Sequence, residues 1–221
     1  MASHHSQPNR RQFLGHLSLV AAATTTGVAV PPLGAESVAD WDMSWVDELA
    51  KAKYKAVFDS PTLADGAAPD LATGIWNNFN EVYGTDEGVR FVIIMRQLGQ
   101  VMAFNDSLWE KYGIGQERNV KDPVTKQPAT RNPYATAAAG EPDWAIGSKL
   151  DTLHTRGAIL LVCNRASMNW AAGAAERTQR PVEEVRAEVR KNLVPGAILM
   201  PTGVFALVRA QNAGCAYMRG S

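Results

Sequence analysis

The chain has 221 residues, of which 46% are hydrophobic and 20% are charged, and its 22 basic and 22 acidic residues give a formal net charge of zero. These values are ordinary for a globular protein with a sizeable core. The balanced charge, with no basic run in the body of the chain, gives no support for a nucleic-acid surface. The two cysteines are too few for a disulfide framework, and no apolar run of about 20 residues predicts a stable membrane span.

The N-terminus carries an export-signal pattern. The segment 9–15 reads Asn-Arg-Arg-Gln-Phe-Leu-Gly, and a mildly apolar stretch softened by serine and threonine follows it at 17–30. The pattern resembles a twin-arginine (Tat) signal, although its first and last residues depart from that pattern. The resemblance implies a cleaved signal over residues 1–35 and a periplasmic mature protein, and the sequence leaves open whether cleavage follows Ala29 or Ala35. An arginine-bearing disordered tail is the alternative.

Removal of residues 1–35 would change the composition of the mature protein. The segment contains two arginines, no acidic residue and three of the four histidines, so the mature chain keeps 20 basic against 22 acidic residues and one histidine, His154. Clustered histidine ligands are therefore not expected, and the sequence predicts no metal site. It assigns no cofactor.

Beyond the signal, strand-like and helix-like segments alternate. Apolar runs predict strands at 55–59, 89–95, 158–162, 197–200 and 215–218. Helical periodicity predicts helices at 40–52, 71–84, 101–112, 149–156, 166–176, 181–193 and 203–210. This order predicts an α/β fold, a three-layer α/β/α arrangement with a mostly parallel sheet of about five strands. Residues 36–221 are expected to form a single domain.

Periodicity is lost between residues 114 and 147, where four prolines and charges of both signs are scattered. An irregular segment of this length is usually a functional lid, a partner surface or a disordered insertion. Trp144, within this insert, has no assigned packing role.

The candidate site begins at Cys163, which directly follows the aliphatic run Ala158–Val162 and directly precedes a helix-like stretch. In an open α/β sheet, ligands bind at the carboxyl ends of the strands. The helix dipole and unpaired N–H groups at a helix start favour a thiolate over a thiol. The alternative is that Cys163 is a buried small hydrophobe.

The other predicted strands also end in polar residues, namely Asp59-Ser60, Arg96-Gln97 and Thr202-Gly203, while Asn164-Arg165 follow the cysteine. In a parallel sheet these ends lie together. Cys163 is thus the candidate reactive residue, and a small anion is expected to bind Arg96, Asn164, Arg165 and Thr202. Either arginine could instead be a solvated strand-end residue.

Two further residues were considered for chemistry. Cys215 starts a predicted edge strand, and the sequence leaves open whether it pairs with Cys163, although an unbonded Cys215 is favoured. His154 precedes the strand that ends at Cys163, at the opposite end of that strand. A catalytic pair of His154 and Cys163 is therefore disfavoured.

Three segments carry a resemblance to the DsrE/DsrF-like (YchN-like) family. They are strand-Cys163-Asn164-Arg165-Ala166, Val194–Ala197 before Pro201–Val204, and the ending Gln211–Tyr217. The resemblance covers about residues 54–112 and 148–219. It implies a three-layer fold, a homo-oligomer and, as in some members, a sulfur carrier whose cysteine bears a persulfide, at the position of Cys163. Cys215, the export signal and the insert depart from the family pattern.

Two hypotheses for function follow, and whether the protein is an enzyme stays open. The first is an exported sulfur carrier or thiol-redox protein that uses Cys163 and interacts with a small sulfur species or a partner protein. The second is a non-catalytic periplasmic binding or assembly subunit that uses the Pro-rich insert. A dehydrogenase is set aside because no Gly-x-Gly-x-x-Gly follows a strand.

Overall fold

The computed structural model describes residues 41–221. Its sheet has five strands in the order β4-β3-β2-β1-β5, and every neighbouring pair is parallel. The strands are β1 (Tyr54–Ser60), β2 (Val89–Met95), β3 (Ile159–Cys163), β4 (Ala197–Met200) and β5 (Ala216–Arg219). The predicted α/β class with a parallel sheet of about five strands is confirmed, and β2 is its middle strand.

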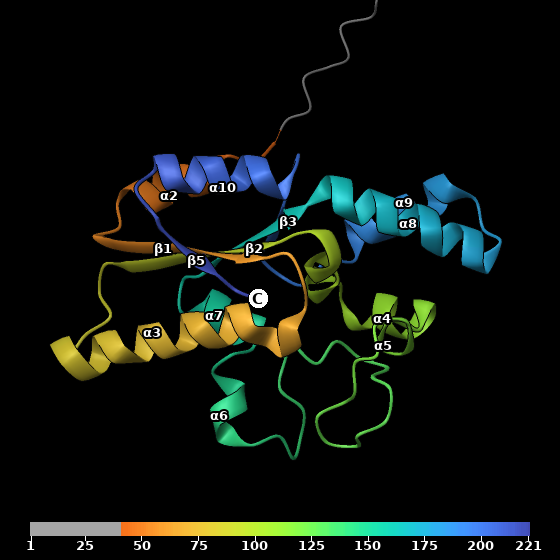
Figure 1. Ribbon diagram of the computed structural model, residues 1–221, viewed down its shortest axis with the longest axis horizontal. Helices are drawn as coiled ribbons and strands as arrows, with labels where there is room; N and C mark the ends of the chain where they lie inside the picture. The colour runs from red at the N-terminus through yellow and green to blue at the C-terminus, as the bar shows by residue number, and fades with distance from the viewer. Residues whose placement is uncertain (1–40) are drawn as a thin grey trace, which may run out of the picture. The chain divides into compact units, whose positions relative to one another are not determined.

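Helices cover both faces of this sheet. On one face lie α2 (Ser44–Ala50) and α10 (Gly203–Asn212), and on the other lie α3 (Ala67–Tyr83) and α7 (Leu150–Thr155) (Figure 1). Side chains alternate between the faces along each strand. Val92 and Ile94 accordingly pack towards α2 and α10, whereas Phe91 and Ile93 pack towards α3 and α7. Because both faces are covered, the inner strands are aliphatic without polar alternation.

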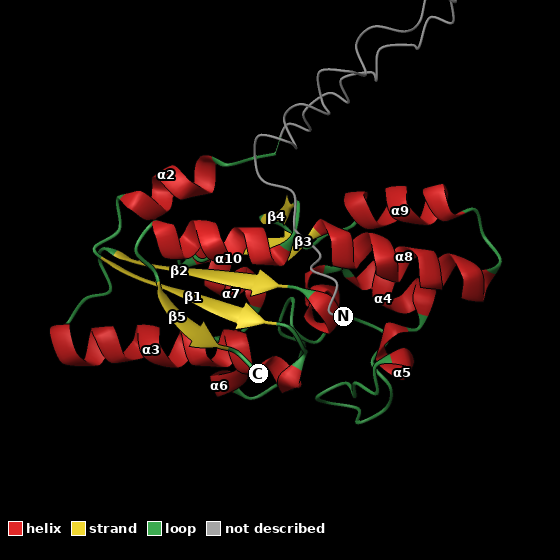
Figure 2. Ribbon diagram, turned by 45° about the horizontal axis from the view of Figure 1, so that its top comes forward, coloured by secondary structure: helices red, strands yellow, loops and turns green. Residues whose placement is uncertain are grey.

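A third group of helices packs beyond the carboxyl ends of β2 and β3. It comprises the 3-10 helix η2 (Gln97–Ala103), α4 (Asp106–Tyr112), α5 (Ile114–Glu117), α8 (Asn164–Thr178) and α9 (Val182–Lys191). These elements bury their own apolar cluster, which includes Phe104, Trp109, Trp170 and Val185. Figure 2 shows α8 and α9 side by side at this end of the sheet.

The single helix predicted over 101–112 is wrong. The chain forms η2 and α4 instead, separated by Phe104 and Asn105 in extended conformation. Asn105 caps α4, because its side chain accepts a hydrogen bond from the Leu108 N–H at 3.2 Å. An N-cap residue needs a non-helical backbone, so the apolar spacing of Val101 and Leu108 spans two elements.

The apolar stripe predicted for α3 is also only partly correct. Leu71 is 45% exposed and Val82 is 69% exposed, whereas Ala68, Ala72 and Trp76 are buried against the sheet. The alanines allow close approach of the helix backbone to the strands. Small side chains and Trp76 form the fully buried part of this face, and Ile75 and Phe79 of the predicted stripe pack against the core while partly buried.

The insert is irregular apart from α5 and α6 (Asp143–Ile146), but buried polar side chains tie it to the domain. Asn132 is fully buried, and its Nδ2 donates hydrogen bonds to the carbonyl oxygens of Met102 at 2.7 Å and Phe104 at 2.6 Å. The buried carboxylate of Glu141 forms ion pairs with Lys149 and Arg131. Buried polar groups are held by such contacts because leaving them unpaired is costly.

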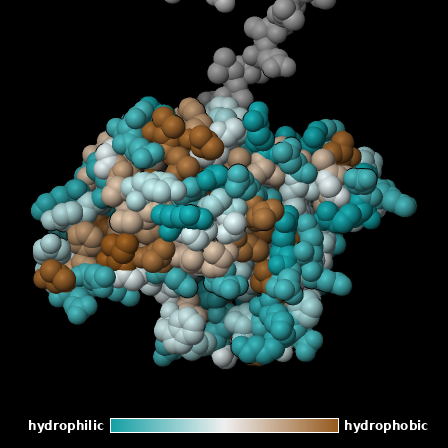
Figure 3. Space-filling model, viewed as in Figure 1, coloured by the Kyte–Doolittle hydropathy of each residue, from teal (hydrophilic) through white to brown (hydrophobic). Residues whose placement is uncertain are grey.

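Apolar side chains also remain at the surface. Figure 3 shows apolar surface over α10, where Val204, Phe205 and Val208 are 59%, 40% and 52% exposed. Trp144 of α6 is 76% exposed. Within residues 41–221, none of the helices combines the length and the apolar character that a membrane crossing requires.

Candidate functional site

A pocket of about 570 Å³ lies at the carboxyl ends of β2 and β3, next to the first turns of α8 and α10. Four of the five predicted site residues line it: Cys163, Arg96, Arg165 and Thr202. Asn164, the fifth, is the first residue of α8 and is not part of the lining. The parallel sheet thus brings together residues from three separate parts of the sequence.

Cys163 is 7% exposed and is the N-cap residue of α8. Its Sγ accepts a hydrogen bond from the Ala166 N–H at 3.4 Å, and its carbonyl oxygen accepts one from Ser167 Oγ at 3.0 Å. A backbone N–H and the positive end of a helix dipole both stabilise negative charge on sulfur. The thiol is largely buried, and it borders the cavity beside the backbone N–H that it binds.

Arg96 lines the pocket, but its charge is already paired. Its Nε and Nη2 donate to the two carboxylate oxygens of Asp59 at 2.6 Å and 2.8 Å, and Asp59 is only 3% exposed. The hydrogen bonding to Asp59 is the largest cause of the raised pKa of Arg96. Tyr217 Oη adds a third bond to the carboxylate, at 3.0 Å. Arg96 is thus a fixed wall of the pocket with a compensated charge.

Gly203 permits this position of Arg96. A Cβ atom on Gly203 would lie 2.6 Å from Arg96 Cβ, which is closer than side chains pack. Thr202, just before it, caps α10, since its Oγ1 accepts a hydrogen bond from the Phe205 N–H at 3.1 Å. Ser60, which the sequence placed at this edge, is fully buried and donates to the Thr62 carbonyl oxygen at 2.8 Å.

The sequence reasoning missed three polar residues of the pocket, Gln100, Arg118 and Asn169. Gln100, on η2, is 2% exposed, and its Oε1 has no hydrogen-bond partner among the described residues. Arg118, from the insert, lies 3.3 Å from Glu117 through Nη2, and its buried Nε has no partner in the same part of the chain. Gln100 is a polar residue within an apolar stretch, which was a usable signal. No such signal in the sequence indicated Arg118, because the insert has no periodicity.

The pocket has a one-sided charge. Among residues 41–221, its lining contains three arginines, Arg96, Arg118 and Arg165, and no acidic residue. The carboxylates of Asp59 and Glu117 partner two of these arginines from outside the lining. Arg165 is exposed and has no ion-pair partner within residues 41–221. Such a lining suits an anionic ligand next to a thiolate.

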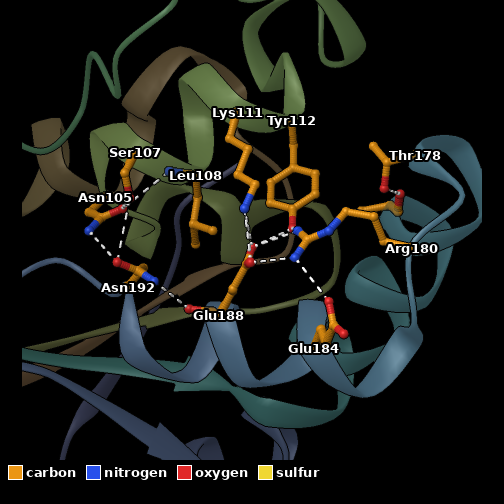
Figure 4. Close-up of polar contacts among 11 residues, drawn as sticks. Asn105, Ser107, Leu108, Lys111, Tyr112, Thr178, Arg180, Glu184, Glu188 and Asn192 are labelled. Atoms are coloured by element: carbon orange, nitrogen blue, oxygen red, sulfur yellow. Dashed lines mark hydrogen bonds and ion pairs between the residues drawn. The ribbon is translucent and has the colours of Figure 1, made fainter.

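A second charged cluster lies between α4 and α9, and Figure 4 shows its contacts. Glu188 accepts hydrogen bonds from Arg180 at 2.7 Å and 3.0 Å, from Lys111 at 2.9 Å and from Tyr112 Oη at 2.6 Å. The bond from Arg180, followed by those from Lys111 and Tyr112, lowers the pKa of Glu188. Burial, and then the bond to Glu188, raises the pKa of Tyr112 to about 12. This cluster is internally satisfied.

The other residues considered for chemistry lie elsewhere. His154 borders a different pocket, together with Gly157 and Gly196 at the amino-terminal end of the sheet. Cys215 packs in the apolar cluster with Val57 and Ala210, and burial raises the pKa of its thiol to about 11. Both cysteines are free. Within residues 41–221, no three His, Cys, Asp or Glu side chains are grouped so that they could hold a metal ion.

No protein-family model matches the chain, and no curated protein matches it at a significant level. Among solved structures, the fold is similar to that of MTH1491, a protein of unknown function from Methanobacterium thermoautotrophicum, with a TM-score of 0.37 and 17% sequence identity. The match covers 75% of this chain and 98% of that one.

Proposed function

We propose that Cys163 is the reactive group of a thiol site that accepts a sulfur atom from a small donor and carries it as a persulfide. The observation that carries this proposal is the setting of the thiol: Cys163 Sγ accepts the Ala166 N–H and borders a pocket with three arginines and no acidic residue. The resemblance of the sequence to the DsrE/DsrF-like family supports the same function.

The transfer step is an exchange at sulfur. The Cys163 thiolate attacks the outer sulfur of a donor persulfide, R–S–SH. The new S–S bond forms on Cys163 as the old one breaks, and the donor leaves as the thiolate R–S⁻, so no external oxidant is needed. A thiolate is the nucleophile in all such exchanges. The N–H of Ala166 and the pocket arginines would stabilise the negative charge before and after transfer.

A labelling experiment tests this proposal. Iodoacetamide at mildly acidic pH should alkylate Cys163 and spare Cys215, because burial raises the pKa of Cys215 to about 11 and leaves it as a thiol. Cys163→Ala should abolish labelling, whereas Cys215→Ala, the matched control, should retain it. Incubation with a sulfane-sulfur donor should add one sulfur to the Cys163 peptide in intact-mass and peptide spectra. Equal labelling of both cysteines, or of neither, would contradict the proposal.

The exposed Trp144 favours a second candidate function, a binding or assembly subunit that contacts its partner through the insert. Tryptophan is enriched at protein–protein contacts. Trp144→Ala should then remove a co-purifying partner without lowering the melting temperature, because Trp144 is 76% exposed and packs little. A partner retained by Trp144→Ala would count against this function.

The expected homo-oligomer stays a prediction, which light scattering of the purified protein can check.

We also propose that the protein is exported through the twin-arginine route. The pattern that supports this lies in residues 9–30, outside the described residues 41–221. Replacing Arg10 and Arg11 together by lysine should leave an uncleaved precursor in the cytoplasm, while the unchanged chain should appear in the periplasm at lower mass. A processed periplasmic product from the double-lysine chain would exclude this route.

A further inference from the structure

The pocket at Cys163 has more room than an inorganic sulfur species needs. Its volume is about 570 Å³, whereas a water molecule occupies about 30 Å³ in the liquid. Pockets of this size hold organic molecules of several tens of atoms. Leu98 and Val204, which are 51% and 59% exposed, add apolar surface to the lining. Hydrosulfide or thiosulfate would leave most of this space to water.

The burial of Cys163 favours a small molecule over a protein donor. Only 7% of the surface of Cys163 is exposed, and the residue lines the pocket. A cysteine on a flat protein surface could not reach Sγ without an arm that enters the pocket. A low-molecular-weight thiol compound can enter whole.

The arginines of the pocket indicate that such a molecule carries carboxylates. Arg165 has no ion-pair partner within residues 41–221, and Arg118 keeps an unpartnered buried Nε beside a single 3.3 Å contact to Glu117. Guanidinium groups bind carboxylates through paired, charge-assisted hydrogen bonds. The lining itself supplies no carboxylate to compete.

Gln100 gives a second, independent indication of a ligand. It is 2% exposed, it lines the pocket, and its Oε1 acceptor has no partner among the described residues. A buried acceptor without a partner is unfavourable, so one at a cavity wall is a natural place for a ligand donor. An amide N–H would satisfy it.

We infer that the Cys163 pocket binds a peptide-like low-molecular-weight thiol compound, in its disulfide or persulfide form, with carboxylates at Arg118 and Arg165 and an N–H group at Gln100. This inference rests on the proposed function, since it takes Cys163 as the reactive thiol. With a disulfide R–S–S–R, the Cys163 thiolate attacks one sulfur and forms a mixed disulfide. The other half leaves as R–S⁻ and takes up a proton from solvent, so the disulfide is the oxidant and the exchange is balanced.

The test compares rates of mixed-disulfide formation at Cys163 for three symmetric disulfides. Oxidised glutathione has carboxylates and amides, dithiodipropionate has carboxylates only, and cystamine has neither and is cationic. The full mature chain is used near neutral pH at about 0.15 M salt, where long-range attraction is screened beyond about 8 Å. Mass spectrometry of the Cys163 peptide gives each rate.

Oxidised glutathione should react fastest and cystamine slowest. Arg118→Gln and Arg165→Gln should each slow glutathione and dithiodipropionate about tenfold and leave cystamine equal or faster, as expected for a lost charge-assisted bond. Arg190→Gln, an exposed residue of α9 outside the pocket, is the matched control and should change nothing. Gln100→Met should slow glutathione alone. Unchanged melting temperatures would show that the variants fold.

Equal rates for the three disulfides, or equal losses in Arg118→Gln and Arg190→Gln, would overturn the inference and leave the reactivity of Cys163 standing. Failure of Cys163 to react with any disulfide or with iodoacetamide would instead refute the proposed function. In that case, calorimetry of S-methylglutathione with the Cys163→Ala chain decides the ligand class. Binding that weakens with Arg118→Gln supports the inference, and an absence of binding overturns it.

Discussion

The cluster around Glu188 and the pocket around Cys163 use similar residues in opposite ways. Around Glu188, Lys111, Arg180 and Tyr112 all converge on one carboxylate within 3.0 Å (Figure 4). Around Cys163, three arginines border a cavity whose lining has no acidic residue. A cationic side chain that meets its counter-charge holds helices together, whereas one without it is available to a ligand.

Arg96 belongs to both kinds of site and shows where the boundary lies. It borders the cavity, yet its guanidinium is held in a bidentate contact by the buried Asp59. Its role is therefore closer to that of Arg180 than to that of Arg165. Variants of these residues test the distinction between arginines that are paired with a carboxylate and arginines that are not. They follow in order of decreasing effect on stability.

The largest effect is expected for Asp59→Ala. Asp59 and Arg96 side chains are 4% and 18% exposed, so the substitution leaves a largely buried guanidinium unpaired. Breaking such a pair costs about 3 kcal/mol of unfolding free energy, which urea denaturation can measure. The same variant should bind sulfate at the pocket more tightly than the unchanged chain. A loss of stability under about 0.5 kcal/mol would show that the pair is not structural.

Glu188→Gln should destabilise the chain by about 1 kcal/mol, because three donors lose their charged acceptor and the site is partly solvated. Glu183→Gln is the control, since Glu183 pairs only with Arg186 and its side chain is 72% exposed. Its unfolding free energy should change by less than about 0.5 kcal/mol. Equal effects of the two substitutions would remove the contrast between the cluster and an ordinary surface pair.

The contribution of Glu188 should also depend on pH. Its folded pKa lies below the ordinary value of 4.5, so the charged form stabilises the fold above that value and the stabilisation is lost as the pH falls towards the folded pKa. The stability difference between the unchanged chain and Glu188→Gln should therefore shrink progressively below about pH 4.5. A constant difference down to about pH 3 would mean that the effect of the substitution is not electrostatic.

The smallest effect on stability is expected for Arg165→Gln. Arg165 is exposed and has no carboxylate partner within residues 41–221, so its removal should change the unfolding free energy by less than about 0.5 kcal/mol. The melting temperature in the absence of ligand checks this. A clear loss would place Arg165 among the structural arginines and remove it from the ligand site.

Elements with a local pattern could be predicted from the sequence alone. The predicted strand at 89–95 matches β2 residue for residue, and Cys163 ends β3 directly before α8, where the aliphatic run stops. The direction of the chain in a parallel sheet also correctly predicted that His154 and Cys163 lie at opposite ends of β3. Such features depend on residues within one or two turns of each other.

Only the tertiary structure decided which charges are compensated and which residues share the pocket. Asp59 and Arg96 are 37 positions apart, and nothing in the local pattern of either residue shows that they pair. Gln100 enters the pocket on a 3-10 helix that periodicity had joined to α4, and Arg118 enters from an insert without periodicity. Contacts between distant segments depend on packing of the whole domain, which a hydrophobic period cannot encode.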